Sequence, residues 1–157
     1  MSGRSDILPV SEPDTEMGFD EAPLANPAQD LAAKWDEAQL ASLNGTPVQL
    51  HPRELSFWTT RFSTEEIDAL IIPKRTLARR RAAREKLTVE ETDKALRLAR
   101  IVAEADRVFG NPEKSSRWLR RKTAALGSLS PLELLKSETG ARAVDELLGQ
   151  IDHGMFI

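Results

Sequence analysis

The strongest chemical signal in the sequence is a run of basic side chains near its middle. Residues 74–86, KRTLARRRAAREK, hold seven lysines and arginines and one glutamate, although the whole chain has a formal net charge of -3. Seven positive groups within about four helical turns repel one another unless an anion offsets them, and nucleic-acid phosphates are such anions. The run predicts DNA contact, with a merely solvated basic surface as the alternative.

The last residues offer a second kind of chemistry. Gly154 is followed by Met155, Phe156 and Ile157, whereas chain ends in water are usually polar and fray harmlessly. Met155 is flexible, Phe156 has a large apolar face, and the carboxylate of Ile157 could meet cationic groups. The residues alone leave the role of this apolar end open, and one interpretation is that it folds back onto the protein's own core.

Side chains that could support catalysis are sparse. The chain has no cysteine and only two histidines, His51 and His153, which are far apart in sequence. It has no phosphate-cradling glycine loop and no serine nucleophile motif. Glutamate pairs at 65–66 and 90–91 fall in the first turns of expected helices, where the helix dipole accounts for them. We therefore expect no enzymatic activity, no metal site and no cofactor.

The basic run belongs to a pattern of two short helices. In STEEIDALIIP, Ser63 precedes Glu66 by three residues, which forms a capping box, and Pro73 prevents one regular helix from continuing. A second helix is expected from Pro73 onward. Two short helices with a tight connection predict a helix-turn-helix whose second helix carries the basic block.

A helical wheel of this second helix separates apolar and basic faces. Leu77 and Ala78 point one way and Arg75, Arg79 and Lys86 the other, with Arg80 and Arg84 on the flank. The side chains expected to contact DNA are Lys74, Arg75, Thr76, Arg79, Arg80 and Arg84.

Further helices are marked by their start and stop signals. One is expected at 27–43 and a short one within HPRELSFWTTRF, where Leu55, Trp58 and Phe62 share a side. The longest runs from Thr88 to Gly110, and its wide apolar stripe predicts a central position. Others start at 111–112 and 130–133, and the last pattern breaks at 154.

Four stretches then form a linked set: IIPKRTLARRR, LTVEETDKALRLARI, VFGNPEKSSRWL and SPLELLKSETGARAVDELLGQIDHG. In order and spacing they resemble the Xre/MbcA/ParS antitoxins, and the whole looks like a ParS-type antitoxin over about residues 63–154. The resemblance implies an all-α, homodimeric protein, with an Xre-like helix-turn-helix part followed by a helical toxin-binding domain.

The resemblance also implies a partner and a mode of inhibition. The partner would be a RES-domain toxin that consumes NAD, by ADP-ribosylating a target or by degrading the dinucleotide. The C-terminus of such antitoxins reaches into the toxin's active-site cleft, so a plug could exclude NAD. Residues expected to contact the toxin are Trp118, Ile151, Asp152, His153, Gly154, Met155, Phe156 and Ile157. Trp118 also suits a core position.

Composition completes the expected organisation. Residues 1–27 hold four of the nine prolines and many acids, which predicts a disordered acidic arm. A helix-turn-helix DNA-binding region is expected at 28–87, and a toxin-binding domain with an inhibitory tail at 88–157. Without a signal peptide or membrane span, the chain is expected in the cytoplasm, away from membranes.

Two departures from the family pattern concern turns. Ile71 stands where the family typically has glycine before IP, and Ser128 where a second glycine often follows Gly127. A β-branched residue resists a left-handed backbone, so a rebuilt turn is expected at Ile71.

Two functions remain open on the sequence. The first is an antitoxin of a type II toxin-antitoxin system that inhibits its toxin and, with it, represses its own promoter. The second is a stand-alone helix-turn-helix regulator whose C-terminal domain only dimerises.

Overall fold

A computed structural model describes residues 26–155 of the chain and consists of helices joined by short turns. In order they are α1 (Pro27–Leu43), η1 (Pro52–Leu55), α2 (Trp58–Arg61), α3 (Thr64–Leu70), α4 (Lys74–Ala83), α5 (Val89–Phe109), α6 (Pro112–Arg120), η2 (Ala124–Leu126), α7 (Pro131–Leu134) and α8 (Glu138–Asp152). No strand occurs within this range, so the predicted all-α class is confirmed. An acidic arm was predicted at residues 1–27. Residues 1–25 of this arm lie outside the described part of the chain.

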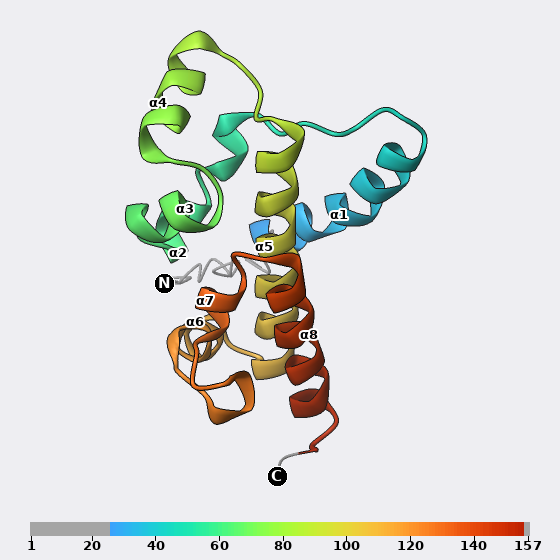
Figure 1. Cartoon of the computed structure of the whole chain (residues 1–157), viewed down its shortest axis with the longest axis vertical. Coiled ribbons are helices and arrows are strands. Elements are labelled where there is room, and N and C mark those ends of the chain that lie inside the picture. Colours follow the sequence, from blue (N-terminus) through green and yellow to red (C-terminus); the bar gives the residue numbers. More distant parts are fainter. Residues whose placement is uncertain (1–25, 156–157) are drawn as a thin grey trace, which may run out of the picture.

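Helix α5 is the axis of the molecule. It packs against α1, α3, α6 and α8, and Figure 1 shows α1 and α8 alongside it and α4 beyond one end. Its predicted stripe is buried at Leu98, Ile101, Val102 and Ala105. The central position predicted from the width of this stripe is confirmed.

Capping residues set the helix starts as the sequence predicts. The boxes formed by Ser63, Thr88 and Ser130 with the glutamates three residues later open α3, α5 and α7. Asn111 caps α6 through hydrogen bonds from two backbone N–H groups. Gly110 ends α5 in the left-handed conformation, φ 62°, which glycine adopts without a side-chain clash.

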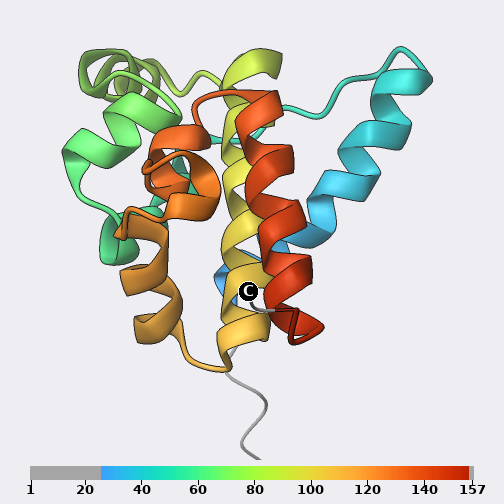
Figure 2. The same cartoon turned by 60° about the horizontal axis from the view of Figure 1, so that its bottom comes forward.

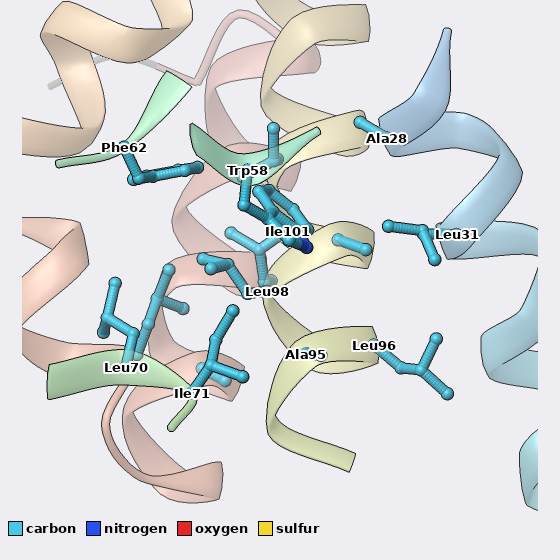
Figure 3. Packing of buried hydrophobic residues seen from close by; sticks show 14 of the residues in the cluster. Ala28, Leu31, Trp58, Phe62, Leu70, Ile71, Ala95, Leu96, Leu98 and Ile101 are labelled. Atoms are coloured by element: carbon cyan, nitrogen blue, oxygen red, sulfur yellow. The ribbon is translucent and has the colours of Figure 1, made fainter. Parts of the chain in front are cut away.

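The core joins the segments on both sides of the helix-turn-helix. Trp58, fully buried, packs against Phe62 with ring centroids 5.4 Å apart. In Figure 3, Leu31 of α1 and Ile101 of α5 point into the same cluster as these rings. On the side of α1 that packs against this cluster, Leu31 and Ala38 are buried and Trp35 is half-buried.

The segment HPRELSFWTTRF differs from the single short helix that its pattern predicts. It forms a 3-10 turn, η1, and then the one-turn helix α2. The predicted common side is nevertheless right, because Leu55, Trp58 and Phe62 are all buried. Alternation between the two helix types leaves these three side chains on one face.

The connection between α3 and α4 is rebuilt around Ile71. This residue has φ -125° and ψ -66°, so it avoids the left-handed region, and its side chain is buried. The Asp68 carboxylate accepts a hydrogen bond from the Lys74 backbone N–H at 2.8 Å and holds the start of α4. At the other departure, Ser128 does adopt a positive φ of 63°, next to Gly127 at 67°.

Helix α4 is shorter than the basic block. It ends at Ala83, and Lys86, which the helical wheel placed on its outer face, lies beyond the helix. Ala78, predicted to face inward with Leu77, is exposed, whereas Leu77 packs on the core. In the part of the chain that the structure describes, no helix is long and apolar enough to cross a membrane.

Candidate functional site

The outer face of α4 presents its basic side chains to solvent. Lys74, Arg75, Arg79 and Arg84 are exposed and Thr76 is half-buried. Since Arg75 and Arg79 are four residues apart, they share one face of the helix. Figure 1 shows α4 at one end of the long axis, where it has few neighbours. Four of these five predicted DNA-contact residues lie on α4, and Arg84 directly follows its last residue.

Arg80, the sixth predicted residue, is held by carboxylates of its own chain. Its Nε lies 3.0 Å from Glu91 at the start of α5, and a second ion pair reaches Glu85 at 3.5 Å. Only 14% of the Arg80 side chain is exposed. This arginine fixes α4 against α5, and a DNA contact would have to compete with these carboxylates.

A cleft beside the C-terminal end of α4 gathers basic side chains that the sequence pattern did not group. Here called the basic cleft, it is lined by His51, Pro52, Arg53, Arg80, Arg81 and Arg84. The first three belong to η1 and the residue before it, which precede the helix-turn-helix. Arg53 and Arg81 were missed as site residues because nothing in the local spacing connects η1 with α4.

A buried ion pair ties the helix-turn-helix part to the C-terminal helices. The Arg61 guanidinium donates to both carboxylate oxygens of Asp106, at 2.6 and 3.0 Å, and also to the hydroxyls of Ser115 and Ser116. The Ser115 hydroxyl donates to Asp106 as well. Asp106 is 8% exposed, so the network is largely dry and sensitive to loss of either charge.

A second tie lies next to this network. Arg120 of α6 makes a two-pronged ion pair with Glu66 of α3, with both distances 2.8 Å, and donates to the Arg61 carbonyl oxygen at 2.8 Å. Burial raises the pKa of Glu66, but hydrogen bonds from Arg120 and the Ser63 backbone N–H outweigh it and leave this pKa lowered. Glu66 thus caps α3 and docks α6 at once.

The C-terminal end of α8 carries the residues predicted to reach a partner. Ile151 is half-buried and Asp152, His153, Gly154 and Met155 are exposed, with 59% of Met155 accessible. Gly154 has φ 67°, which turns the chain away from the helix axis. Phe156 and Ile157 lie outside the described residues.

Asp152 is anchored at this end. Arg107 donates to it at 2.8 Å and to Glu104 at 2.6 Å. The Arg107 hydrogen bond holds the pKa of the Asp152 carboxyl below its ordinary value. The last turn of α8 is therefore fastened to α5. The backbone N–H groups of Gly154 and Met155 still donate to carbonyl oxygens of α8, so the chain stays bound to this helix end as far as Met155.

Trp118 lies apart from the end of α8. It is half-buried on α6 and packs on Phe109 with ring centroids 5.3 Å apart. Figure 2 shows α6 and α8 on different sides of the lower part of α5. The structure therefore gives Trp118 a role in packing, and its predicted toxin contact stays a prediction.

The two candidate surfaces occupy opposite ends of the molecule. Figure 1 shows α4 at the top and the end of α8 at the bottom. Among the residues that the structure describes, no group of three or more histidine, aspartate or glutamate side chains could hold a metal ion. The arrangement suits two macromolecular contacts made at the same time.

Two family models match the chain in succession. The antitoxin Xre-like helix-turn-helix domain matches residues 59–100, and the antitoxin Xre/MbcA/ParS C-terminal toxin-binding domain matches residues 104–154. The first range contains α3 and α4, and the second contains α6 to α8. The first range ends and the second begins inside α5, whereas the boundary predicted at 87/88 precedes that helix and stays a prediction.

Curated relatives agree with these matches. Antitoxin Xre of Yersinia enterocolitica is 33% identical over 141 residues, which are 83% of this chain and 95% of the relative. Antitoxin Xre of Pseudomonas putida is 40% identical over 84 residues, 54% of this chain and 53% of the relative. The Prs ADP-ribosylating antitoxin of a Sphingobium species is 32% identical over 98 residues, 57% of this chain and 62% of the relative. The chain thus belongs to the Xre/MbcA/ParS family of antitoxins.

Proposed function

We propose that this antitoxin neutralises a NAD-consuming RES-domain toxin by inserting its C-terminal residues into the toxin's active-site cleft. The observation that carries the proposal is the end of α8, where the chain turns at Gly154 and the side chain of Met155 is exposed. The Sphingobium relative, called Prs ADP-ribosylating antitoxin, supports the proposal because its name connects such an antitoxin with ADP-ribosylation. In the complex, the plug excludes the dinucleotide from its site.

The test is NAD consumption by the purified toxin, titrated with full-length antitoxin and with a chain that stops at Gly154. The truncation spares the buried positions Val144 and Leu148 of α8, so folding should be unaffected. Burial of a large apolar side chain contributes roughly 1.5–3 kcal/mol before ordering costs. The truncated chain should bind the toxin more weakly and leave part of its activity. Equal midpoints and equal complete inhibition would contradict the plug.

We further propose that α4 binds operator DNA and represses the antitoxin's own promoter, alone or with the toxin bound. The exposed pair Arg75 and Arg79 supports this, because both side chains point away from the core on the second helix of the helix-turn-helix. Replacing both with alanine should weaken promoter binding and reduce its salt dependence, with toxin neutralisation retained. If the double variant retards a promoter fragment in a gel-shift assay as strongly as wild type does, this face of α4 is not the DNA-binding surface.

The second candidate function is that of a stand-alone transcriptional regulator, which would bind DNA but would have no toxin partner. Exposed Met155 favours the antitoxin, because dimerisation alone does not need it. Co-expression with the product of the adjacent gene, followed by co-purification, separates the two. A stable complex supports the antitoxin, and its absence supports the regulator.

A further inference from the structure

The basic cleft has a charge that the rest of the molecule does not neutralise. Its lining contains four arginines and a histidine but no acid. Arg80 is paired with Glu91 and Glu85, while in residues 26–155 the exposed Arg53, Arg81 and Arg84 make no ion pair. Three arginines without an ion-pair partner among the described residues therefore line one cleft, in a chain whose net charge is -3.

The backbone at Arg84 is a second, independent observation. Arg84 has φ 55° and ψ 31° at the C-terminal end of α4, a left-handed conformation that glycine adopts far more readily. Its backbone N–H bonds back to α4, which glycine would do equally well. Compared with glycine at this position, the strained arginine therefore differs only in having a side chain. Arg84 is one of the residues that line the cleft.

The length of α4 relates the cleft to DNA. At about 1.5 Å per residue, Arg84 lies roughly 13 Å along the helix from Arg75, which is close to the ~12 Å width of the major groove. A recognition helix contacts base edges with its N-terminal residues. The C-terminal end of such a recognition helix then lies near the sugar-phosphate backbone that forms the wall of the groove.

We propose that the basic cleft binds a backbone phosphate of DNA and serves as a sequence-independent anchor beside the base-reading face of α4. Arg53, Arg81 and Arg84 supply the hydrogen bonds, and Arg80, held by Glu91, keeps the wall of the cleft in place. The anchor includes residues 51–53, which lie outside the helix-turn-helix match at 59–100. This inference rests on the proposed DNA binding.

The test compares wild type with Arg53→Ala/Arg84→Gly on an operator fragment and on an unrelated duplex, across a salt series. Removing a phosphate contact weakens binding to all sequences alike, so both affinities should fall by about tenfold. The slope of log affinity against log salt should become shallower by about one to two. Arg84→Gly alone should raise the thermal midpoint, because glycine relieves the left-handed strain, and the thermal midpoint of the double variant, measured alongside, shows that it is folded.

Two matched variants complete the design. Lys114→Ala/Arg117→Ala removes two exposed positive charges from α6 and should leave the operator affinity within about twofold of wild type. Arg75→Ala/Arg79→Ala should instead reduce the preference for the operator over the unrelated duplex.

The outcomes separate the cleft from DNA binding itself. If wild type binds the operator and the cleft variant binds with the same affinity and slope, the anchor is wrong and the DNA-binding function stands. A loss confined to the operator also overturns the anchor, since it would mean base reading. If wild type binds neither duplex at low salt, DNA binding and the anchor are both wrong.

Discussion

Arg61 and Asp106, 45 residues apart in sequence, face each other with two hydrogen bonds of 2.6 and 3.0 Å. Their side chains are 13% and 7% exposed. Arg61 lies on α2 of the helix-turn-helix range, whereas Asp106 lies in the part of α5 that belongs to the toxin-binding range. This largely buried ion pair is thus one of the contacts that join the two parts of the antitoxin.

The first prediction concerns this pair. Asp106→Asn keeps the size of the side chain but leaves the Arg61 charge without its carboxylate, which should lower the free energy of unfolding by about 3 kcal/mol. Urea denaturation measures the change. As the control, Glu104→Gln affects an ion pair whose arginine, Arg107, is half exposed, and should change stability by less than about 1 kcal/mol. Similar values for the two variants would show that Arg61 is readily solvated.

A second prediction uses two glycines of α8. A Cβ at Gly140 would lie 2.0 Å from the Leu134 carbonyl oxygen, so Gly140→Ala must push the end of α7 away. We expect a loss of about 3 kcal/mol or more. At Gly149 nothing lies within 4 Å of an added Cβ, and alanine favours a helix. Gly149→Ala should therefore stabilise by about 0.5–1 kcal/mol. Thermal unfolding that moves both variants in the same direction would contradict this packing.

A third prediction follows from Glu66. Because its pKa is lowered in the folded chain, this carboxylate stabilises the fold above its unfolded pKa, near 4.5, and the contribution is lost as pH falls through the lower folded value. Glu66→Gln should therefore be less stable than wild type at pH 7, with a difference that shrinks below about pH 4. Glu146→Gln, at an exposed position of α8, is the control and should show no such trend. Chemical denaturation at several pH values tests both.

The fourth prediction concerns the homodimer that we propose on the family resemblance. Leu40 and Leu43, at the C-terminal end of α1, are 63% and 84% exposed, and Figure 1 shows this end of α1 away from α5. We expect Leu40→Lys/Leu43→Lys to shift the sedimenting species from dimer to monomer, because burying two lysines in an apolar contact is costly. Leu129→Lys, at another exposed leucine, should stay dimeric. A double variant that remains a dimer would place the interface elsewhere.

The sequence predicted what local rules decide. Capping boxes located the starts of α3, α5 and α7, and periodicity located the buried stripe of α5, since both depend on residues three or four apart. The same wheel identified Arg75 and Arg79 as exposed.

Other features depend on contacts that no local pattern encodes. The C-terminal end of α4 was missed because Arg84 takes a left-handed conformation without the glycine that usually signals it. The pairing of Arg80 with Glu91 and of Arg61 with Asp106 joins distant segments, so neither the position of Arg80 nor the tie between the two parts was predicted. The basic cleft was missed for the same reason.

The continuity of α5 has a consequence for folding cooperativity. One family range ends and the other begins inside this helix, so neither part can melt without exposing side chains that the other part covers. The chain should unfold in a single transition, with backbone amides on the two sides of residue 102 exchanging hydrogen at equal free energies of opening. A protease that cleaves only unfolded chain would therefore have access to both parts of the protein at the same time. Degradation would then remove the proposed promoter binding and the proposed toxin inhibition together, and would leave no helix-turn-helix fragment behind.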